Sequence, residues 1–162
     1  MSREIELSRG LVAIVDDEDF EWLSAHSWCA KPTTGGKFYA HRGGRGHSIY
    51  MHRAIMDAPV GLEVDHADRD TLNNRRENLR ICTRSDNCAN SANRIGQSGF
   101  RGVALDKRNG KWFAMIFAEG KRTRIGSFED PVHAALARDA AAKEKFGSFA
   151  ILNFPSETGV TL

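Results

Sequence analysis

Residues 64–93 read VDHADRDTLNNRRENLRICTRSDNCANSAN and carry the strongest pattern in the chain. Two short apolar segments, 62–64 and 79–82, flank a polar loop that is rich in Asp, Arg and Asn. Short apolar segments separated by such a loop are typical of paired strands. A threonine or serine before the next segment favours a helix that runs to about Asn93. The stretch is therefore predicted to fold as strand, loop, strand and helix.

The first predicted strand ends in two side chains that suit phosphodiester hydrolysis, Asp65 and His66. This reaction needs a base that deprotonates water and a dication that stabilises the phosphorane and the departing oxygen. A neutral histidine suits the first task because its pKa lies near working pH. A carboxylate and an amide oxygen are hard ligands that suit Mg²⁺ or Mn²⁺. Asn87, on the predicted helix, could complete such a metal site.

His66, Asn78 and Asn87, with Asp65 beside the histidine, resemble the HNH endonucleases, whose core is also called the ββα-metal or His-Me finger fold. The resemblance implies that His66 is the general base and that Asn78 braces the loop. It implies that Asp65 and Asn87 bind one divalent ion per site, and that products carry 5′-phosphate and 3′-hydroxyl ends. The helical position is Asn where other members have His, which is a known variant of the family.

The residues before the motif also resemble phage and intron homing endonucleases of this class. His52 and Arg53 are therefore candidates for DNA contact, although a structural role for His52 is an equal alternative. Taken singly, an Asp-His pair or a helical Asn is an ordinary turn or cap, so the prediction rests on the whole constellation. No cysteine or histidine grouping has zinc spacing, and no structural zinc is expected.

Upstream of the motif the sequence predicts a small mixed region. Residues 5–15 are expected to form a short strand, and the acidic residues 16–19 a turn. A glycine-rich stretch over residues 35–50 is interleaved with aromatic residues, which is typical of a loose hairpin. Residues 51–57 are predicted to form a short helix that stops before Pro59.

The C-terminal part alternates apolar and polar residues in three segments, 100–105, 111–118 and 122–128. An Asn-Gly turn between such segments is a strong hairpin signal. Asp130 and Pro131 then predict the start of a helix that ends at Gly147. The expected apolar stripe of this helix is Val132, Ala135, Leu136, Ala140 and Phe146. These segments therefore predict a three-stranded antiparallel sheet packed on one helix.

Residues 98–155 are similar over nearly their whole length to the Apetala-two (ethylene-response-factor) DNA-binding domain. The matching points are Arg101–Val103, Gly110–Trp112, Ile125–Phe128, Asp139–Ala141 and Leu152–Phe154. The resemblance implies a sheet that enters the major groove of duplex DNA, where arginine reads guanine well. The candidates for base or phosphate contact are Arg101, Lys107, Arg108, Lys111, Arg122 and Arg124.

Two features of this segment limit what the resemblance implies. Trp112 is as well suited to packing against the helix as to contacting DNA. Ala104, Met115 and Phe117 stand where polar or charged readers usually occur, so a target sequence cannot be carried over.

Charge is distributed unevenly along the 162 residues, although the net charge is only +2. Residues 1–30 have a balance of −5 and residues 94–128 a balance of +6. Such asymmetry suggests contact with a polyanion, and a solvated surface is the alternative. No apolar run has membrane length, no signal-peptide layout opens the chain, and the three cysteines form no CxxC pair. We expect a reduced, cytoplasmic protein of a bacterial or phage-infected cell, without membrane contact.

The sequence predicts the α+β class: an HNH core followed by a three-stranded sheet on one helix. The expected domains are a nuclease domain at 1–93, with its ββα-metal motif at about 61–93, a linker at 94–98, a DNA-binding domain at 99–155 and a tail at 156–162. The expected function is a metal-dependent endonuclease, of homing type, that acts on double-stranded DNA as a monomer or weak dimer. The alternatives are a non-catalytic DNA-binding regulator with a degenerate HNH unit, a nuclease of RNA or junctions, and a protein-interaction domain.

Overall fold

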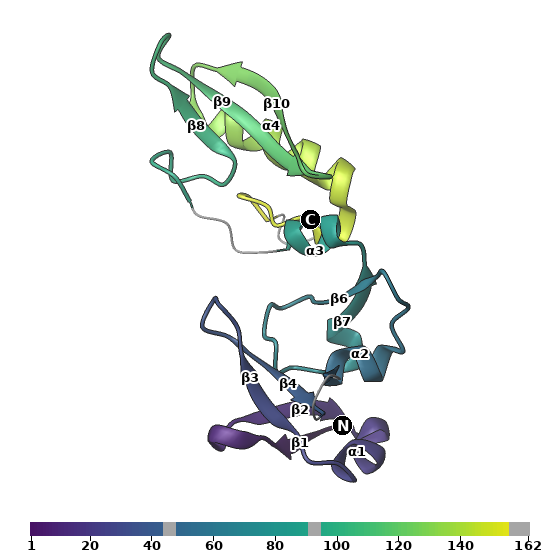
Figure 1. Ribbon diagram of the computed structural model, residues 1–162. Coiled ribbons are helices and arrows are strands. Elements are labelled where there is room, and N and C mark those ends of the chain that lie inside the picture. The colour runs from purple at the N-terminus through teal and green to yellow at the C-terminus, as the bar shows by residue number, and fades with distance from the viewer. Residues whose placement is uncertain (44–47, 91–94, 156–162) are drawn as a thin grey trace, which may run out of the picture. The chain divides into compact units, whose positions relative to one another are not determined.

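The protein is described by a computed structural model covering residues 1–43, 48–90 and 95–155 (Figure 1). It divides into two compact units, Met1–Arg84 and Ser85–Leu162. Each unit combines helix and strand, which confirms the expected α+β class. None of the helices in these described ranges is long and apolar enough to span a membrane. The predicted tail at 156–162 lies outside the described residues.

The first unit contains three small antiparallel sheets (Figure 1). β1 pairs with β2, β4 lies between β3 and β5, and β6 pairs with β7. Its elements are β1 (Ser2–Glu6), η1 (Ser8–Gly10), β2 (Val12–Asp16), α1 (Asp17–Ser24), β3 (Cys29–Pro32), β4 (Phe38–Arg42), β5 (Ile49–Tyr50), α2 (Met51–Met56), β6 (Glu63–His66), η2 (Arg76–Asn78) and β7 (Leu79–Cys82).

The N-terminal segment differs from its prediction in two ways. The expected single strand at 5–15 is a hairpin of β1 and β2, which turns at Arg9 and Gly10, both with positive φ. The expected acidic turn is the first turn of α1. The positive end of the helix dipole stabilises carboxylates at this position, so the acidic residues favour a helix start rather than a loop.

One apolar core joins the three sheets of the first unit. Alternate residues of the strands point inward, and α1 and α2 add Leu23, Met51 and Ile55. The predicted strands at 62–64 and 79–82 are present as β6 and β7, and each contributes one residue to this core. The predicted glycine-rich hairpin is present as β4 and β5, although residues 44–47 lie outside the described ranges. The helix predicted at 51–57 is α2, which ends at Asp57 in the left-handed conformation.

The acidic residues of α1 hold the loop between β6 and β7. Asp19, which is 2% exposed, accepts two hydrogen bonds from the guanidinium of Arg76, at 2.8 and 2.7 Å. Asp16 accepts from the Arg76 backbone N–H at 2.7 Å. The bidentate geometry is the strongest form of this interaction. Part of the negative charge at the N-terminus therefore has a structural role.

The second unit is a three-stranded antiparallel sheet with one long helix packed against it (Figure 1). The central strand is β9, between β8 and β10, and β10 has a bulge between Arg124 and Gly126. The sheet and helix confirm the predicted order, including the start of α4 at Asp130 and Pro131. Asp130 accepts from the backbone N–H of Val132 at 2.6 Å. The elements are α3 (Arg84–Ala89), β8 (Val103–Asp106), β9 (Lys111–Ala118), β10 (Lys121–Phe128), α4 (Pro131–Phe146) and η3 (Gly147–Phe149).

The buried face of α4 matches the predicted apolar stripe only in part. Ala135 and Phe146 are buried as predicted, whereas Val132, Leu136 and Ala140 are exposed, so their place in the stripe was wrong. The helix instead packs on the sheet through small residues, because alanine lets the backbones approach closely. The buried residues of α4 are Ala134, Ala135, Arg138, Asp139, Ala142 and Phe146.

A buried polar network links α4 to the segment before β8 and to the C-terminal segment that follows the helix. The Asp139 carboxylate accepts from Arg138 at 3.0 Å and from the backbone N–H of Asn153 at 2.6 Å. The Asn153 amide accepts from the backbone N–H of Arg101 at 2.7 Å and donates to its carbonyl at 3.1 Å. Buried polar groups must be paired in this way to avoid a large desolvation cost. The network therefore holds the C-terminal segment and the segment before β8 together with α4.

The helix α3 belongs to this second unit, although the predicted boundary placed it in the nuclease domain. Ala89 packs in a small core with Ala142 and Phe146 of α4. The division at Arg84 therefore lies earlier in the chain than the predicted linker at 94–98. The predicted helix end near Asn93 lies outside the described residues.

Gly102 occupies a position that no other residue can fill without strain. Its φ is +71°, and an added Cβ would lie 2.6 Å from the carbonyl oxygen of Met115. The Met115 backbone N–H also donates to the Gly102 carbonyl at 2.8 Å. Gly110 has the same φ, but nothing lies within 4 Å of its added Cβ.

The Asp19→Ala variant should lower the free energy of unfolding of the first unit by about 2–3 kcal/mol, because Arg76 loses a charge-assisted bidentate partner. Glu21→Ala is the matched control on the same helix: it removes only an exposed ion pair with Arg3 and should change stability by at most about 0.5 kcal/mol. Chemical denaturation followed by circular dichroism measures both. Equal effects of the two variants would contradict a structural role for Asp19.

Comparing Gly102→Ala with Gly110→Ala separates the energetic cost of the backbone conformation from the cost of close packing. Both variants place a side chain at φ +71°, which costs about 1–2 kcal/mol. Only Gly102→Ala also forces β9 away, so its total cost should exceed about 3 kcal/mol. Thermal unfolding of the two variants tests the difference. A smaller loss of stability in Gly102→Ala than in Gly110→Ala would contradict the close approach of Gly102 to β9.

Candidate active site

The candidate site lies at the end of β6, where the strand pairs with β7. Asp65 is opposite Arg80, and His66 is opposite Leu79. Because neighbouring strand residues point to opposite faces, the two predicted site residues leave the strand in different directions. Asp65 and His66 are buried, at 5% and 4% exposure. The Asp65 carboxylate accepts a hydrogen bond from the Arg80 guanidinium.

Asn78 closes the loop that follows His66. Its side-chain oxygen accepts from the Asp68 backbone N–H at 3.0 Å, and its amide nitrogen donates to the Asn73 carbonyl at 2.8 Å. The same amide nitrogen donates to the Asp68 carboxylate at 2.9 Å. The Ala67 backbone N–H donates to the Asn78 carbonyl at 2.8 Å. These bonds join the two ends of the loop, which is the bracing geometry expected for Asn78.

Asn74 is a residue of the site that sequence reasoning missed. It is fully buried, and its side-chain oxygen lies 3.5 Å from Nε2 of His66. Its amide nitrogen donates to the Leu72 carbonyl at 3.0 Å, and its backbone N–H donates to Ile14 in β2 at 2.7 Å. The bond to Leu72 sets the amide so that its oxygen faces the imidazole. A hydrogen bond to this oxygen requires the proton of neutral His66 on Nε2, which leaves Nδ1 as the basic atom.

Aromatic rings surround the His66 imidazole. The His52 ring lies edge-on to His66 with centroids 5.1 Å apart, and the Tyr39 ring lies 5.9 Å from His66. Tyr50 lies 5.6 Å from His52. Such packing excludes water from the imidazoles and disfavours their charged forms.

Both imidazoles are neutral at neutral pH for the same physical reason. Burial, helped by His66 and Arg53, lowers the pKa of His52 to about 3. Burial also lowers the pKa of His66, although the hydrogen bond with Asn74 and the nearby carboxylates oppose this shift. A neutral imidazole is the form that a general base needs.

His52 and Arg53 are placed by α2, and neither offers much surface to DNA. His52 is 8% exposed and packs among the rings, which favours its structural alternative. The Arg53 guanidinium donates to the carbonyls of Leu62, Ala58 and Pro59, at 2.7, 3.1 and 3.2 Å. It therefore holds the turn before β6. DNA contact by these two residues stays a prediction that the packing disfavours.

The predicted metal ligand Asn87 lies on α3, in the second unit. Within the described part of the chain, no three His, Cys, Asp or Glu side chains gather as a metal site. The predicted donor set does not need such a cluster, because it combines one carboxylate with an amide. Both are hard oxygen donors of the kind that Mg²⁺ accepts. A cation at Asp65 would have to share or replace the ion pair with Arg80.

In the second unit, the strand register places part of the predicted basic set on the sheet face opposite α4. Ala114 is buried against the helix, so the alternate residues Met115 and Phe117 face away from it. Arg124 is paired with Met115, and Arg122 with Phe117, so both arginines share this free face. The Arg124 guanidinium also lies 4.7 Å from the centre of the Phe113 ring.

The other predicted DNA contacts differ in what holds them. Lys107 is exposed at the β8–β9 turn, Arg108 donates to Asp106 at 3.1 Å, and Lys111 pairs with Glu129 at 2.7 Å. Arg101, in contrast, is 8% exposed and donates to the Ala89 carbonyl at 2.9 Å. Its burial disfavours contact with DNA, and its role in packing was not foreseen.

Trp112 faces α4 rather than the free face of the sheet. It packs against the core of Val103, Ala114, Ala134 and Ala135. Of the two roles expected for this side chain, the structural one fits its position.

Comparisons with known proteins agree with the motif. A model of the HNH endonuclease family matches residues 57–89, a span that includes His66, Asn78 and Asn87. The chain is 28% identical over 136 residues to the uncharacterised HNH endonuclease L560 of Acanthamoeba polyphaga mimivirus, covering 83% of this chain and 67% of that protein.

Two further relatives match shorter stretches of the chain. Protein 3.8 of Escherichia phage T7 is 30% identical over 84 residues, which is 51% of this chain and 69% of that protein. Ethylene-responsive transcription factor ERF025 of Arabidopsis thaliana is 48% identical over 58 residues, 35% of this chain and 24% of that protein. Together, the family-model match and the mimivirus relative show that this chain carries an HNH endonuclease domain.

Proposed function

We propose that the protein is a metal-dependent endonuclease, of homing type, that nicks or cleaves duplex DNA at a site centred on His66. The observation that carries the proposal is the set of hydrogen bonds around this imidazole. Asn74 orients it, Asn78 closes the loop behind it, and the family match covers the same residues. In this proposal residues 61–93 correspond to the ββα-metal motif, as the resemblance of their sequence implies.

His66 acts as the general base through Nδ1. The Asn74 oxygen engages Nε2–H, so Nδ1 takes the proton from a water molecule. The oxygen of this water attacks the phosphorus, the bond from phosphorus to the 3′ oxygen breaks, and the departing 3′ oxygen takes a proton from solvent. The products carry 5′-phosphate and 3′-hydroxyl ends. Because burial lowers the pKa of His66, the imidazole is ready to accept a proton at neutral pH.

Asp65 and Asn87 are the residues that would hold a divalent cation, Mg²⁺ or Mn²⁺. When bound, the cation supplies positive charge that stabilises the phosphorane and the departing oxygen. Arg80, the partner of Asp65, keeps this buried carboxylate paired before the cation binds. Removing one partner of a buried pair is costly, which gives Arg80 a role in the metal-free state.

The second unit binds the DNA duplex through the sheet face opposite α4, as an Apetala-two-type domain. The similarity to ERF025 over 58 residues and the exposed cations of this face support the proposal. Because Arg101 is buried, the proposed contacts are Lys107, Arg108, Lys111, Arg122 and Arg124. The protein would act on DNA in the cytoplasm, as a monomer or weak dimer.

A non-catalytic DNA-binding regulator is the second candidate. The observation that favours it is the burial of Asp65 and His66, which leaves little surface for a water or a phosphate. Catalytic geometry often tightens or opens only in the substrate complex, so metal-dependent cleavage decides between the two.

His66→Ala should lower the rate of Mg²⁺-dependent nicking of a supercoiled plasmid by at least about 100-fold, because the reaction loses its general base. Conversion to nicked circle is measured by gel electrophoresis, with EDTA as the metal-free control. His26→Ala is the matched control, since this histidine is exposed in the same unit. Nicking by His66→Ala at the wild-type rate would refute the assignment, and no nicking by the wild type would favour the regulator.

Affinity for duplex DNA, measured by fluorescence anisotropy in EDTA, should fall with salt. If the five proposed cations neutralise phosphates, the slope of log affinity against log salt is about −4.5. Arg124→Gln should make the slope less steep by about one. Lys143→Gln, on α4, should leave it unchanged, because α4 covers the opposite face of the sheet. A salt-independent affinity, or the same change for both variants, would contradict the proposed binding face.

A further inference from the structure

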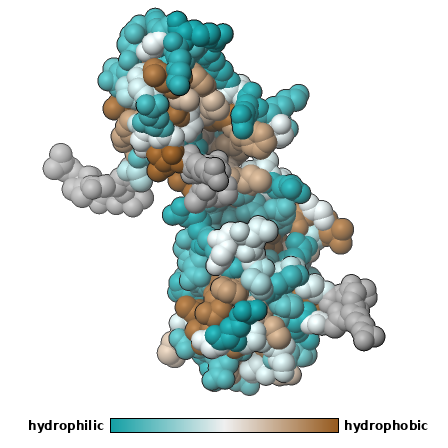
Figure 2. All heavy atoms as spheres, turned by 60° about the vertical axis from the view of Figure 1, so that its left-hand side comes forward, coloured by the Kyte–Doolittle hydropathy of each residue, from teal (hydrophilic) through white to brown (hydrophobic). Residues whose placement is uncertain are grey.

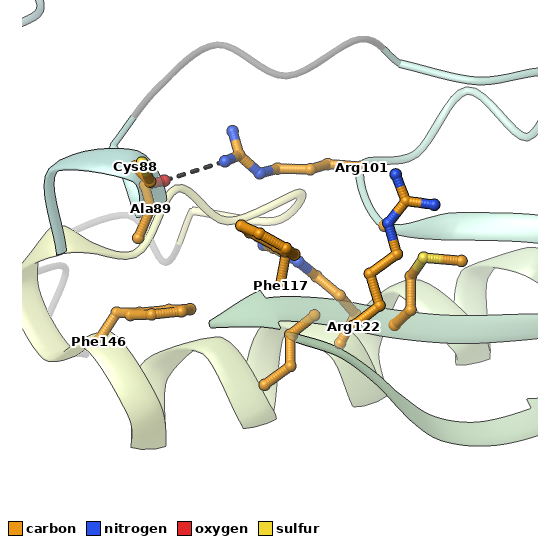
Figure 3. A pocket seen from close by; sticks show the side chains of 10 residues that line it. Cys88, Ala89, Arg101, Phe117, Arg122 and Phe146 are labelled. Carbon is orange, nitrogen blue, oxygen red and sulfur yellow. Dashed lines mark hydrogen bonds between the residues drawn. The ribbon is translucent and has the colours of Figure 1, made fainter. Parts of the chain in front are cut away.

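The second unit contains a pocket of about 530 Å³ at one end of the sheet, which shares Arg122 with the proposed duplex-binding face. On the face of the molecule that Figure 2 shows, apolar side chains form small groups among hydrophilic ones. One exposed apolar side chain, Phe117, is 51% exposed and lines the pocket. Cys88 and Ala89 of α3 and Phe146 of α4 form other walls (Figure 3).

Two arginines fix the walls of the pocket. Arg101 donates to the Ala89 carbonyl at 2.9 Å, as Figure 3 shows. Arg138 is buried, donates to Asp139 at 3.0 Å and also donates to the Ile151 carbonyl. Gly102 lies against Arg138 and Met115 without room for a Cβ. These contacts hold the walls before any ligand arrives, so little ordering accompanies binding.

Arg122 differs from these two arginines. It extends from β10, next to Phe117 of β9 across the strand pair, and its side chain is exposed. Among residues 1–43, 48–90 and 95–155 it makes no hydrogen bond or ion pair. In Figure 3 the guanidinium groups of Arg101 and Arg122 lie above the ring of Phe117, and Phe146 lies below it. An aromatic face and an available cation thus share one pocket.

The aromatic ring and the cation together indicate which class of ligand the pocket can bind. Aromatic side chains stack with nucleobases, and arginine binds phosphate oxygens through two parallel hydrogen bonds. No carboxylate lines the pocket in the described part of the chain, so nothing there repels an anion. A volume of about 530 Å³ is typical of sites for small organic ligands and is too small for a duplex.

We propose that this pocket binds one unpaired nucleotide of the DNA strand, with its base against Phe117 and its phosphate at Arg122. The inference rests on the proposed function, which makes DNA the substrate. Extracting a base from a duplex costs a few kcal/mol, and this cost is least where the base is already unpaired. The protein should therefore bind a duplex with one bulged nucleotide more tightly than the same duplex fully paired.

The test compares two variants of one strand, Phe117→Leu and Phe113→Leu. Both residues lie on the free face of β9, but only Phe117 lines the pocket. Affinity of the full chain for the bulged and the paired duplex is measured by fluorescence anisotropy in EDTA, which prevents cleavage. Phe117→Leu should weaken binding to the bulged duplex about 5- to 150-fold, since stacking on an aromatic ring is lost. Phe113→Leu, beside Arg124 on the proposed duplex-binding face, should change both affinities by the same factor and leave the preference for the bulged duplex unchanged.

Further arms separate the possible outcomes. Arg122→Gln should also reduce the preference for the bulged duplex, and deoxyadenosine monophosphate added as a competitor shows whether a free nucleotide occupies the pocket as well. Equal wild-type affinity for both duplexes would overturn the proposal. Equal losses on both duplexes in Phe117→Leu would overturn it too, because Phe117 would then contact the paired duplex. Plasmid nicking is scored separately, so loss of the proposed nuclease function cannot be mistaken for failure of the pocket.

Discussion

The segment that joins β6 to β7 runs from Ala67 to Asn78 with little secondary structure, and its backbone groups need partners. The side-chain amide of Asn78, at the end of the segment, provides some of them, since it bonds to the backbone of Asp68 near the start and of Asn73 in the middle. The same closure brings Asn74 beside His66. Without it the imidazole would lose its orienting partner, and the position of the proposed general base would no longer be set. The chemistry of the first unit depends on this one amide.

The second unit satisfies its irregular segments in a related way. Asp139, buried on α4, binds the backbone of the C-terminal segment, and Asn153 in that segment binds the backbone of Arg101. The alanines of α4 allow the helix to lie close to the sheet, so these polar groups are shielded from water. Hydrogen bonds in such surroundings are stronger than in solvent, and unpaired groups are correspondingly costly. In both units, buried polar side chains set the shape of segments that neither helix nor sheet organises.

The distribution of charge has a different meaning in the two units. Arg76 binds Asp16 and Asp19 and so neutralises part of the acidic excess at the N-terminus. In the basic segment, Asp106 and Glu129 neutralise part of the cationic surface. Arg122, at the pocket, is one of the cations for which the described residues provide no hydrogen bond or ion pair. Attraction to a polyanion therefore depends on which charges remain exposed after folding and not on the balance counted along the chain.

The sequence by itself determined the features that depend on near neighbours. The turn at Asn109 and Gly110, the start of α4 at Asp130 and the paired strands around the HNH motif all follow from residues within about a dozen positions. Alternation and capping preferences act over this range, which is why they could be predicted. The bracing role of Asn78 came instead from the resemblance of the motif to a known family.

Only the tertiary structure decided the roles of residues whose partners are distant or ambiguous. Asp19 meets Arg76 57 positions away, and Asn74 is held by Ile14 of another sheet. Arginine is a residue type that often contacts DNA, but Arg101 is buried and donates a hydrogen bond to the carbonyl of Ala89 in α3. The alanine-rich α4 has no single apolar stripe, so the sheet selected its face. A side chain's neighbours in space are set by packing of the whole unit, and local pattern carries no information about them.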